Sequence, residues 1–151
     1  ALILEPQLII ADEPVSALDA SVQAQILNML NELKQDLNLT MIFISHDLSV
    51  IKFIADKVAV MYLGEILEIG TTEEIFDNPL HPYTKALLNA VPKFGKTTES
   101  VLQGDLPDEL PDGCKFASRC IHTNDKCKLA CPDFIDISET HKVRCSDVKL
   151  A

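Results

Sequence analysis

Hydrophobic and polar positions follow two different periods in the first part of the chain. A continuous apolar run at 8–11 ends in two acids and a proline, which is typical of a parallel strand buried on both faces. From 22 to 37 apolar residues recur every three or four positions, which predicts an amphipathic helix with Asp19 or Ser21 as its cap. The pattern thus changes from strand to helix near Asp19.

The same alternation continues through the next segments. The run "TMIFISHD" (40–47) predicts a second buried strand, "DLSVIKFIA" (47–55) a second helix, and 57–70 two strands about a turn near Gly64. The order β-α-β-α-β indicates the α/β class, with the strands in a sheet joined by helical crossovers.

Two shorter helices are expected after these strands. Thr71 or Thr72 fits the cap of the first, with Glu74 near its third position. Residues 78–92 predict the second, bracketed by prolines, and Pro82 suits its first turn.

Composition changes sharply in the last third of the chain. From 93 to 113 the sequence is polar and rich in Pro, Gly, Asp and Thr, as linkers are, and all five cysteines follow it. The 151 residues are long enough for one domain, or for part of one with a small appendage.

Charge and hydropathy exclude several classes of function. The net charge is -10 and the 13 basic residues are scattered, which argues against nucleic acid as a partner. The longest apolar runs are far shorter than the roughly 20 residues that cross a bilayer, and no signal-peptide pattern opens the chain.

Three side chains are candidates for chemistry at the ends of the two buried strands. Asp12 and Glu13 would emerge at a sheet edge, where one carboxylate can hold Mg²⁺ and the other can deprotonate an attacking water. His46 would reach the same edge and could contact a γ-phosphate. In the alternative interpretation, Asp12 caps a turn, Glu13 is solvated and His46 is a core or cap histidine.

The motifs in combination resemble the nucleotide-binding subunit of an ABC transporter. "LIIADEP" (8–14) resembles its Walker B motif, "SALD" (16–19) its D-loop and "ISHD" (44–47) its switch-histidine segment. The resemblance implies that Asp12 binds Mg²⁺ through water, Glu13 is the catalytic base and His46 senses the γ-phosphate. The D-loop residues, which would contact a partner domain across the sandwiched ATP, are Ser16, Ala17, Leu18 and Asp19.

Two later stretches narrow this resemblance. "NPLHPYTKALLNAVP" (78–92) and "LPDGCKFASRC" (110–120) resemble the C-terminal extension of oligopeptide and dipeptide importer ATPases, in the peptide and nickel uptake group. His81, Pro82 and Tyr83 are expected to start and pack a helix only. The resemblance implies four parts. Residues 1–75 are the C-terminal half of an ABC ATPase domain, with an incomplete P-loop NTPase fold. Residues 76–95 are a helical extension, 96–113 a linker and 114–151 a Cys-rich segment.

A phosphate cradle is missing from the sequence. Gly95, Lys96 and Thr97 imitate the end of a P-loop, but Ala90 stands where the pattern requires glycine. The chain alone is therefore expected neither to bind ATP tightly nor to hydrolyse it.

Three chemistries compete for the cysteines. A reducing cytosol, which the ATPase resemblance implies, disfavours disulfides; His141 and Cys145, spaced H-x3-C, keep zinc open; and four thiolates can hold an iron–sulfur cluster. Unliganded thiols in a packed tail are the fourth interpretation. The resemblance implies a [4Fe-4S] cluster held by Cys114, Cys120, Cys127 and Cys145. Cys131 is then either not a ligand or a substitute for one of these four.

The resulting hypothesis is an ATP-hydrolysing subunit that uses ATP and Mg²⁺ to drive uptake of oligopeptides or dipeptides. Its implied partners are a second ATPase subunit, identical or distinct, transmembrane permease subunits and, indirectly, an extracytoplasmic peptide-binding protein, at the cytoplasmic face of the membrane. One alternative is a metal- or cluster-binding docking or regulatory module with a non-catalytic ATPase remnant. A receiver-like domain with Asp12 as phospho-acceptor is weaker, because receivers need a complete five-stranded sheet.

Overall fold

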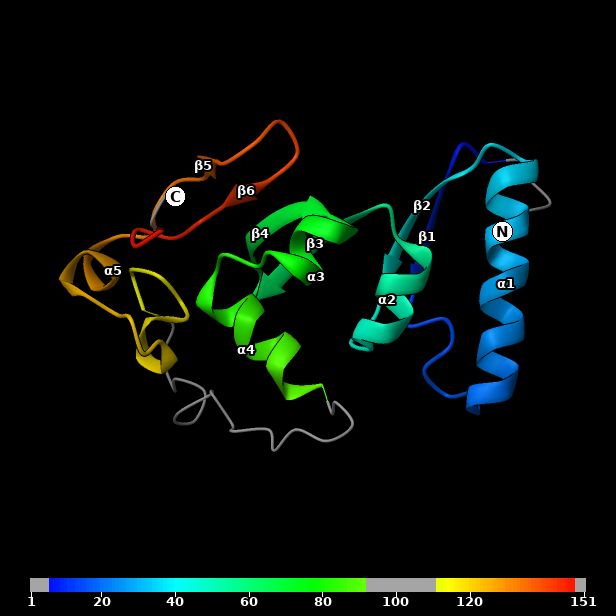
Figure 1. Cartoon of the computed structure of the whole chain (residues 1–151), viewed down its shortest axis with the longest axis horizontal. Helices are drawn as coiled ribbons and strands as arrows, with labels where there is room; N and C mark the ends of the chain where they lie inside the picture. Colours follow the sequence, from blue (N-terminus) through cyan, green and yellow to red (C-terminus); the bar gives the residue numbers. More distant parts are fainter. Residues whose placement is uncertain (1–5, 92–110, 149–151) are drawn as a thin grey trace. The chain divides into compact units, whose positions relative to one another are not determined.

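The computed structural model describes residues 6–91 and 111–148, which form helices and strands of a mixed α/β protein (Figure 1). The chain divides into two compact units, Ala1–Ala55 and Asp56–Ala151. The first contains β1 (Leu8–Asp12), α1 (Ala20–Asp36), β2 (Thr40–Ile44) and α2 (Leu48–Ile54). The second contains β3 (Lys57–Tyr62), β4 (Glu65–Thr71), α3 (Thr72–Asp77), α4 (Pro82–Ala90), a 3₁₀ turn (Ala117–Arg119), α5 (Asp125–Leu129), β5 (Ile135–Asp136) and β6 (Lys142–Val143).

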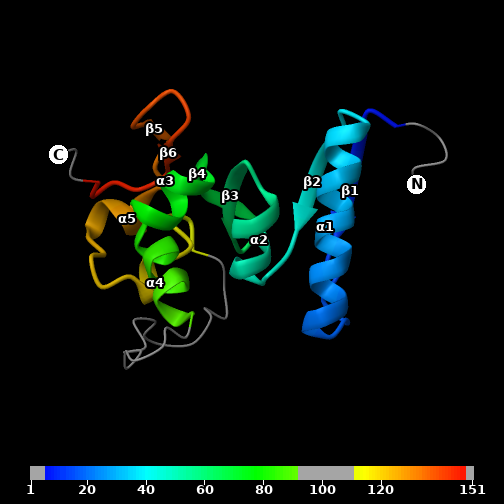
Figure 2. The same cartoon turned by 45° about the vertical axis from the view of Figure 1, so that its right-hand side comes forward.

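In the first unit, β1 and β2 pair in parallel, with Leu8 opposite Thr40 and Asp12 opposite Ile44. Figure 2 shows α1 running alongside the two strands. The helices and one face of the strands share a core because their apolar positions meet there. Its members are Val15, Ile26, Leu27, Leu30, Phe43, Val50 and Ile54.

Both helices of this unit begin at a capping aspartate. The Asp19 carboxylate accepts the N–H groups of Ser21 and Val22 at 3.1 and 3.0 Å, and Asp47 accepts those of Ser49 and Val50. Each cap satisfies N–H groups that have no partner within the helix. The predicted helices are confirmed, and of the two caps proposed for the first, Asp19 is the one used.

The other face of the β1–β2 pair is open, which corrects the expectation that these strands are buried on both faces. Residues on that face are 46 to 64% exposed although they are large and apolar. The described part of the first unit supplies helices for one face alone, so alternate residues of each strand remain in contact with solvent. These residues are Leu8, Ile10, Ile42 and Ile44.

The second unit contains an antiparallel sheet with strand order β3-β4-β6-β5. The turn predicted near Gly64 is confirmed as a two-residue connection, Leu63 (φ 45°) and Gly64 (φ 79°). Two successive residues with positive φ are what a type I′ hairpin needs, and such a hairpin returns β4 antiparallel beside β3. The expectation that the third strand joins the first two in one sheet is therefore wrong, because β3 pairs with β4 instead.

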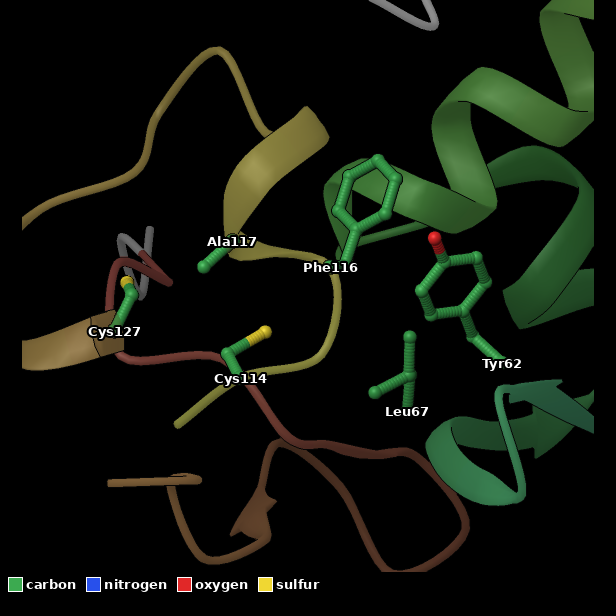
Figure 3. Close-up of a cluster of buried hydrophobic side chains, with 6 residues drawn as sticks. All are labelled: Tyr62, Leu67, Cys114, Phe116, Ala117 and Cys127. Atoms are coloured by element: carbon green, nitrogen blue, oxygen red, sulfur yellow. The ribbon is translucent and has the colours of Figure 1, made fainter. Parts of the chain in front are cut away.

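The cysteine segment packs into the same core as the β3–β4 hairpin. Figure 3 shows the six buried side chains of this core, which include Tyr62 and Leu67 from the hairpin and Cys114, Phe116, Ala117 and Cys127 from the tail. The rings of Tyr62 and Phe116 meet edge to face, with centroids 5.5 Å apart. Burial of Leu67 and Phe116 contributes roughly 1.5–3 kcal/mol each to holding the tail on the hairpin.

Helices α3 and α4 of the second unit begin as their sequences predict. Thr71 caps α3 in a capping box with Glu74: each side chain accepts the backbone N–H of the other residue, at 3.2 and 2.8 Å. Pro82 occupies the first turn of α4, and His81 caps that helix.

None of the helices in the described ranges has the length and apolar character that spanning a membrane requires. Residues 92–110 lie outside the described residues, and with them Gly95, Lys96, Thr97 and most of the predicted linker. The division into two compact units is based on contacts and does not test the functional boundaries proposed from the sequence. The boundaries at residues 75, 95 and 113 therefore stay predictions.

Candidate functional site

The parallel pairing of β1 and β2 brings the predicted catalytic residues to one edge. Asp12 ends β1 opposite Ile44, the last residue of β2, and the Glu13 N–H donates to the Ile44 carbonyl at 3.0 Å. His46 follows two residues later. Because the carboxyl ends of parallel strands meet at the same edge, Asp12, Glu13 and His46 were expected to gather there, and the structure places them there.

Glu13 and His46 contact each other directly. His46 Nδ1 lies 2.8 Å from Glu13 Oε1, and the hydrogen bond and charge of Glu13 raise the pKa of the imidazole above its ordinary value. The second carboxylate oxygen, Oε2, is buried and has no hydrogen-bond partner within the described residues. The arrangement leaves one carboxylate oxygen on the histidine and one buried oxygen without a partner.

The backbone of Glu13 is in the left-handed region, with φ 46°. A residue with a Cβ pays roughly 1–2 kcal/mol for this conformation because its Cβ approaches the following carbonyl oxygen. Strained backbone at a polar side chain is common where a protein must aim that side chain. Here it turns the chain directly after β1 and leaves the Glu13 carboxylate beside His46.

The predicted D-loop residues lie on the surface between β1 and α1. Ser16 Oγ and Ser16 N–H both contact the Glu13 carbonyl, at 3.0 and 3.3 Å. Ala17 and Leu18 are exposed, and Asp19 is used as the cap of α1. The roles of these residues and of Asp12 toward ATP, Mg²⁺ or a partner stay predictions.

Four of the five cysteines border one cavity in the second unit. The fifth, Cys131, is not among the residues that line this cavity, and none of the five forms a disulfide. Apolar walls come from Pro82, Phe116 and Pro132. The four cysteines at the cavity are those predicted as cluster ligands: Cys114, Cys120, Cys127 and Cys145.

Burial disfavours the thiolate form of three of the four cavity cysteines. Burial raises the pKa of Cys114 to about 11, and it raises those of Cys120 and Cys145 as well. No three His, Cys, Asp or Glu side chains of the described residues are gathered closely enough to hold a metal ion. His141, the predicted zinc partner of Cys145, is hydrogen-bonded to Glu68 and does not line the cavity.

A glycine precedes the first of the cavity cysteines and packs against the backbone near Cys127. Gly113 packs so closely on the backbone of Cys127 and Lys128 that an added Cβ would overlap the Cys127 carbonyl oxygen. The next residue, Cys114, donates its N–H to that carbonyl at 2.8 Å. The cysteines at 114 and 127 are therefore held together by backbone contacts that leave no room for a side chain.

A buried carboxylate that the sequence pattern does not reveal joins three segments of the second unit. Glu68 is fully buried and accepts the N–H groups of Leu80 and His81 and a hydrogen bond from His141 Nε2, at 2.7, 3.0 and 2.8 Å. Such bonds satisfy a carboxylate that would otherwise be costly to bury. Glu68 and His141 are 73 residues apart, so no local signal could have paired them.

His81 is buried beside this carboxylate. Its Nδ1 accepts the Tyr83 N–H at 3.0 Å, which caps α4. Burial lowers the pKa of the ring to about 4, with a further lowering from Lys85 and an opposing effect of Glu68. Neutral His81 thus starts the helix, as the sequence predicts.

The chain is similar to proteins of known description. Residues 67–127 match the family described as "Oligopeptide/dipeptide transporter, C-terminal region". The oligopeptide transport ATP-binding protein AppF of Bacillus subtilis is 51% identical over 96% of this chain and 46% of its own length. OppF of Escherichia coli, with the same description, is 49% identical over 98% of the chain and 46% of its own length.

A solved structure, that of cbiO1 from Clostridium perfringens, part of the ABC transporter complex cbiONQ, also matches. It is 32% identical, with a TM-score of 0.48, and the match covers 51% of this chain and 31% of that one. The chain spans about half the length of the curated relatives that it matches. With the family match at residues 67–127 and relatives about half identical over almost the whole chain, the chain is similar to the C-terminal part of the ATP-binding proteins of oligopeptide and dipeptide transporters.

Proposed function

We propose that the chain is part of an ATP-hydrolysing subunit that drives ABC-type import of oligopeptides or dipeptides. The observation that carries the proposal is the 2.8 Å contact between Glu13 and His46 at the carboxyl ends of two parallel strands. A carboxylate and a histidine at that edge suit phosphoryl transfer, in which positioning and charge supply most of the rate. The similarity to AppF and OppF, two oligopeptide transport ATP-binding proteins, supports the same assignment.

Each residue at the edge has a part in this proposal. Glu13 accepts the proton of the attacking water, and His46 holds one of its carboxylate oxygens and faces the γ-phosphate. Asp12 holds Mg²⁺ through water, and the ion would neutralise charge on the phosphates. Ser16, Ala17, Leu18 and Asp19 are exposed and would face the second ATPase subunit.

The proposed assembly follows from the same family. The chain would work with a second ATPase subunit, identical or distinct, and with transmembrane permease subunits that place it at the cytoplasmic face of the membrane. An extracytoplasmic peptide-binding protein would deliver the cargo. The alternative of a regulatory module with an inactive ATPase remnant has no support from the relatives, which are described as ATP-binding proteins of transport.

Peptide uptake by a chimera tests this proposal. The chain replaces the matching region of Escherichia coli OppF, with which it is 49% identical, in a strain that lacks OppF. We expect the chimera to restore uptake of a labelled tripeptide, whereas OppF with that region deleted does not. A chimera that reaches the membrane with its permease but imports no peptide, or imports nickel instead, would contradict the proposal.

We also propose that Cys114, Cys120, Cys127 and Cys145 hold a [4Fe-4S] cluster. Two observations support it: these four thiols line one cavity, and Cys131 is instead hydrogen-bonded to Glu65. The donors fit the group in kind and number, since four thiolates are its usual ligands. In the present arrangement they do not converge on a metal position, so the proposal requires the sulfurs to move closer when the group binds.

Anaerobic reconstitution of the 151-residue chain with iron and sulfide tests the cluster. We expect about four iron and four sulfide per chain and a brown colour, because a [4Fe-4S] cluster has that composition. Replacing Cys127 with Ser should lower the iron content strongly, whereas the matched change Cys131→Ser should leave it unchanged. Stoichiometric zinc in a colourless protein, or equal loss of iron in both variants, would overturn the assignment.

A further inference from the structure

The segment that follows β5 crosses β4 and then reaches the cysteine cavity. Three of the cavity cysteines lie within residues 114–127, whereas Cys145 comes after β6 and reaches the cavity together with Ser146. Figure 1 shows this last stretch, in red, running from β6 past α5. Residues 137–147 are called the strap below. One wall of the cavity therefore belongs to the strap, and the other cysteines belong to a different segment.

The strap covers the thiol of Cys127. Ser146 Oγ lies 3.1 Å from the Cys127 sulfur, and Cys127 is 8% exposed. The neighbouring residues 113 and 114 are packed directly on the Cys127 backbone, where Gly113 leaves no room for a Cβ and the Cys114 N–H donates to the Cys127 carbonyl. The strap meets Cys127 through side chains instead. Of these two segments, the strap is therefore the one that can leave Cys127 without breaking a close backbone contact.

Two carboxylates hold the first part of the strap on β4 and α3. The Ser138 hydroxyl donates to Glu74 Oε1 at 2.9 Å, and the Thr140 hydroxyl lies 3.0 and 2.9 Å from the two Glu74 oxygens. His141 Nε2 lies 2.8 Å from Glu68 Oε1, and both of these side chains are buried. Hydrogen bonds to charged groups are the stronger ones, so these contacts favour the closed strap.

Both carboxylates keep other partners when the strap leaves. Glu68 still accepts the N–H groups of Leu80 and His81, and Glu74 still accepts the N–H of Thr71 in the capping box of α3. A buried carboxylate without any donor would be costly, and these backbone donors avoid that cost. Detachment of the strap thus leaves neither carboxylate without a hydrogen bond.

Little apolar surface holds the strap. Among residues 137–147, all of which the structure describes, the buried side chains are those of His141 and Val143. β6 pairs with β4 over two residues, and the Arg144 N–H adds one bond to the Leu67 carbonyl at 2.8 Å. Segments with few buried apolar contacts and short ladders open at a lower free energy than the whole domain. The strap is therefore the part of this core that can open while the β3–β4 hairpin stays folded.

We propose that the strap is a lid over the cysteine cavity, closed by its hydrogen bonds to Glu68 and Glu74, and that its local opening controls access to the Cys127 thiol. Cys145 lies on the strap itself, so opening also moves this thiol away from the other three at the cavity. The structure shows the closed state. This role of the strap is independent of the proposed ATPase function and of any group that the cavity binds.

Alkylation of the folded 151-residue chain by iodoacetamide tests the lid. Digestion and mass spectrometry give the rate at Cys127 in four forms: unchanged, Thr140→Val, His141→Leu and the control Thr123→Val. Thr123 is exposed, lies outside the strap and does not line the cavity. The rate follows the population of the open form when opening and closing are fast. We expect it to rise about tenfold in His141→Leu and about threefold or more in Thr140→Val, because each loses hydrogen bonds to a carboxylate, and to stay unchanged in Thr123→Val.

Urea separates local opening from unfolding of the whole unit. A lid exposes little surface when it opens, so the Cys127 rate should change little at low urea, whereas unfolding followed by tyrosine fluorescence depends steeply on urea. A Cys127 rate that rises in parallel with global unfolding would overturn the lid, as would strap variants that react no faster than Thr123→Val. If His141→Leu does not fold, Thr140→Val decides, since valine has nearly the shape of threonine and leaves the cap of α3 in place.

Discussion

Replacing Glu13 with Gln in the OppF chimera is expected to lower kcat for ATP hydrolysis by about 10² to 10⁴-fold, the usual contribution of a general base. The amide has the size of the carboxylate and can still accept from His46, but it cannot take the proton of water. ATP affinity should change little, because Glu13 acts on the water rather than on the nucleotide. Phosphate release by the purified chimera gives kcat, and a separate nucleotide-binding measurement gives the ATP affinity.

The control for this experiment is the same substitution at Glu32, which lies exposed on α1 and away from the sheet edge. Glu32→Gln should hydrolyse ATP at the rate of the unchanged chimera. If Glu13→Gln retained a rate within about threefold of that value, the residue would not be the base and the proposed mechanism would fail, since a lost base costs at least about 10²-fold.

Replacing His81 with Asn is expected to remove a large part of the acid sensitivity of the second unit. His81 is buried and its pKa is lowered to about 4 from 6.5, so the folded state disfavours protonation. Its stabilising effect is complete above pH 6.5 and is lost as the pH falls toward 4, because the unfolded chain binds the proton first. The unchanged chain should lose on the order of 3 kcal/mol more than His81→Asn over this range.

Asparagine keeps the cap of α4, since its side-chain oxygen can accept the Tyr83 N–H as the imidazole does. The chain has two tyrosines and no tryptophan, and Tyr62 and Tyr83 pack together in the second unit, with centroids 4.6 Å apart. Tyrosine fluorescence during urea unfolding at pH 7 and pH 4 therefore reports that unit alone. The matched variant His122→Asn, at an exposed histidine of the second unit, should keep the full acid sensitivity. If both variants behaved alike, burial of His81 would not be the cause.

Local sequence patterns were sufficient to predict the helices and strands of the first unit and to place Glu13 and His46 at the same sheet edge. The 3.6-residue period and the capping aspartate define α1, and the rule that parallel strands end at a shared edge brings Glu13 and His46 together once β1 and β2 are recognised. These are properties of a few neighbouring residues, and they do not depend on the rest of the chain.

Partners that are distant in sequence could not be predicted in the same way. Alternation along β3 and β4 predicts the hairpin but not its other neighbours, so the expectation of one sheet shared with β1 and β2 was wrong and the pairing of β4 with β6 was not foreseen. The acidic residue at 68 looks like any solvated glutamate, although His141 and the start of α4 enclose it. The hydrogen bond between Ser146 and Cys127 likewise depends on how the tail folds back on α5.

At Glu13, the left-handed backbone conformation lowers stability, while the side chain that it presents is needed for the proposed activity. Glycine would adopt φ 46° without the roughly 1–2 kcal/mol that a Cβ costs there, and it would remove the carboxylate at the same time. The chain with glycine at this position should be harder to unfold and, in the proposed mechanism, unable to activate water. Stabilising the protein by relaxing this turn would therefore inactivate the site that the turn presents.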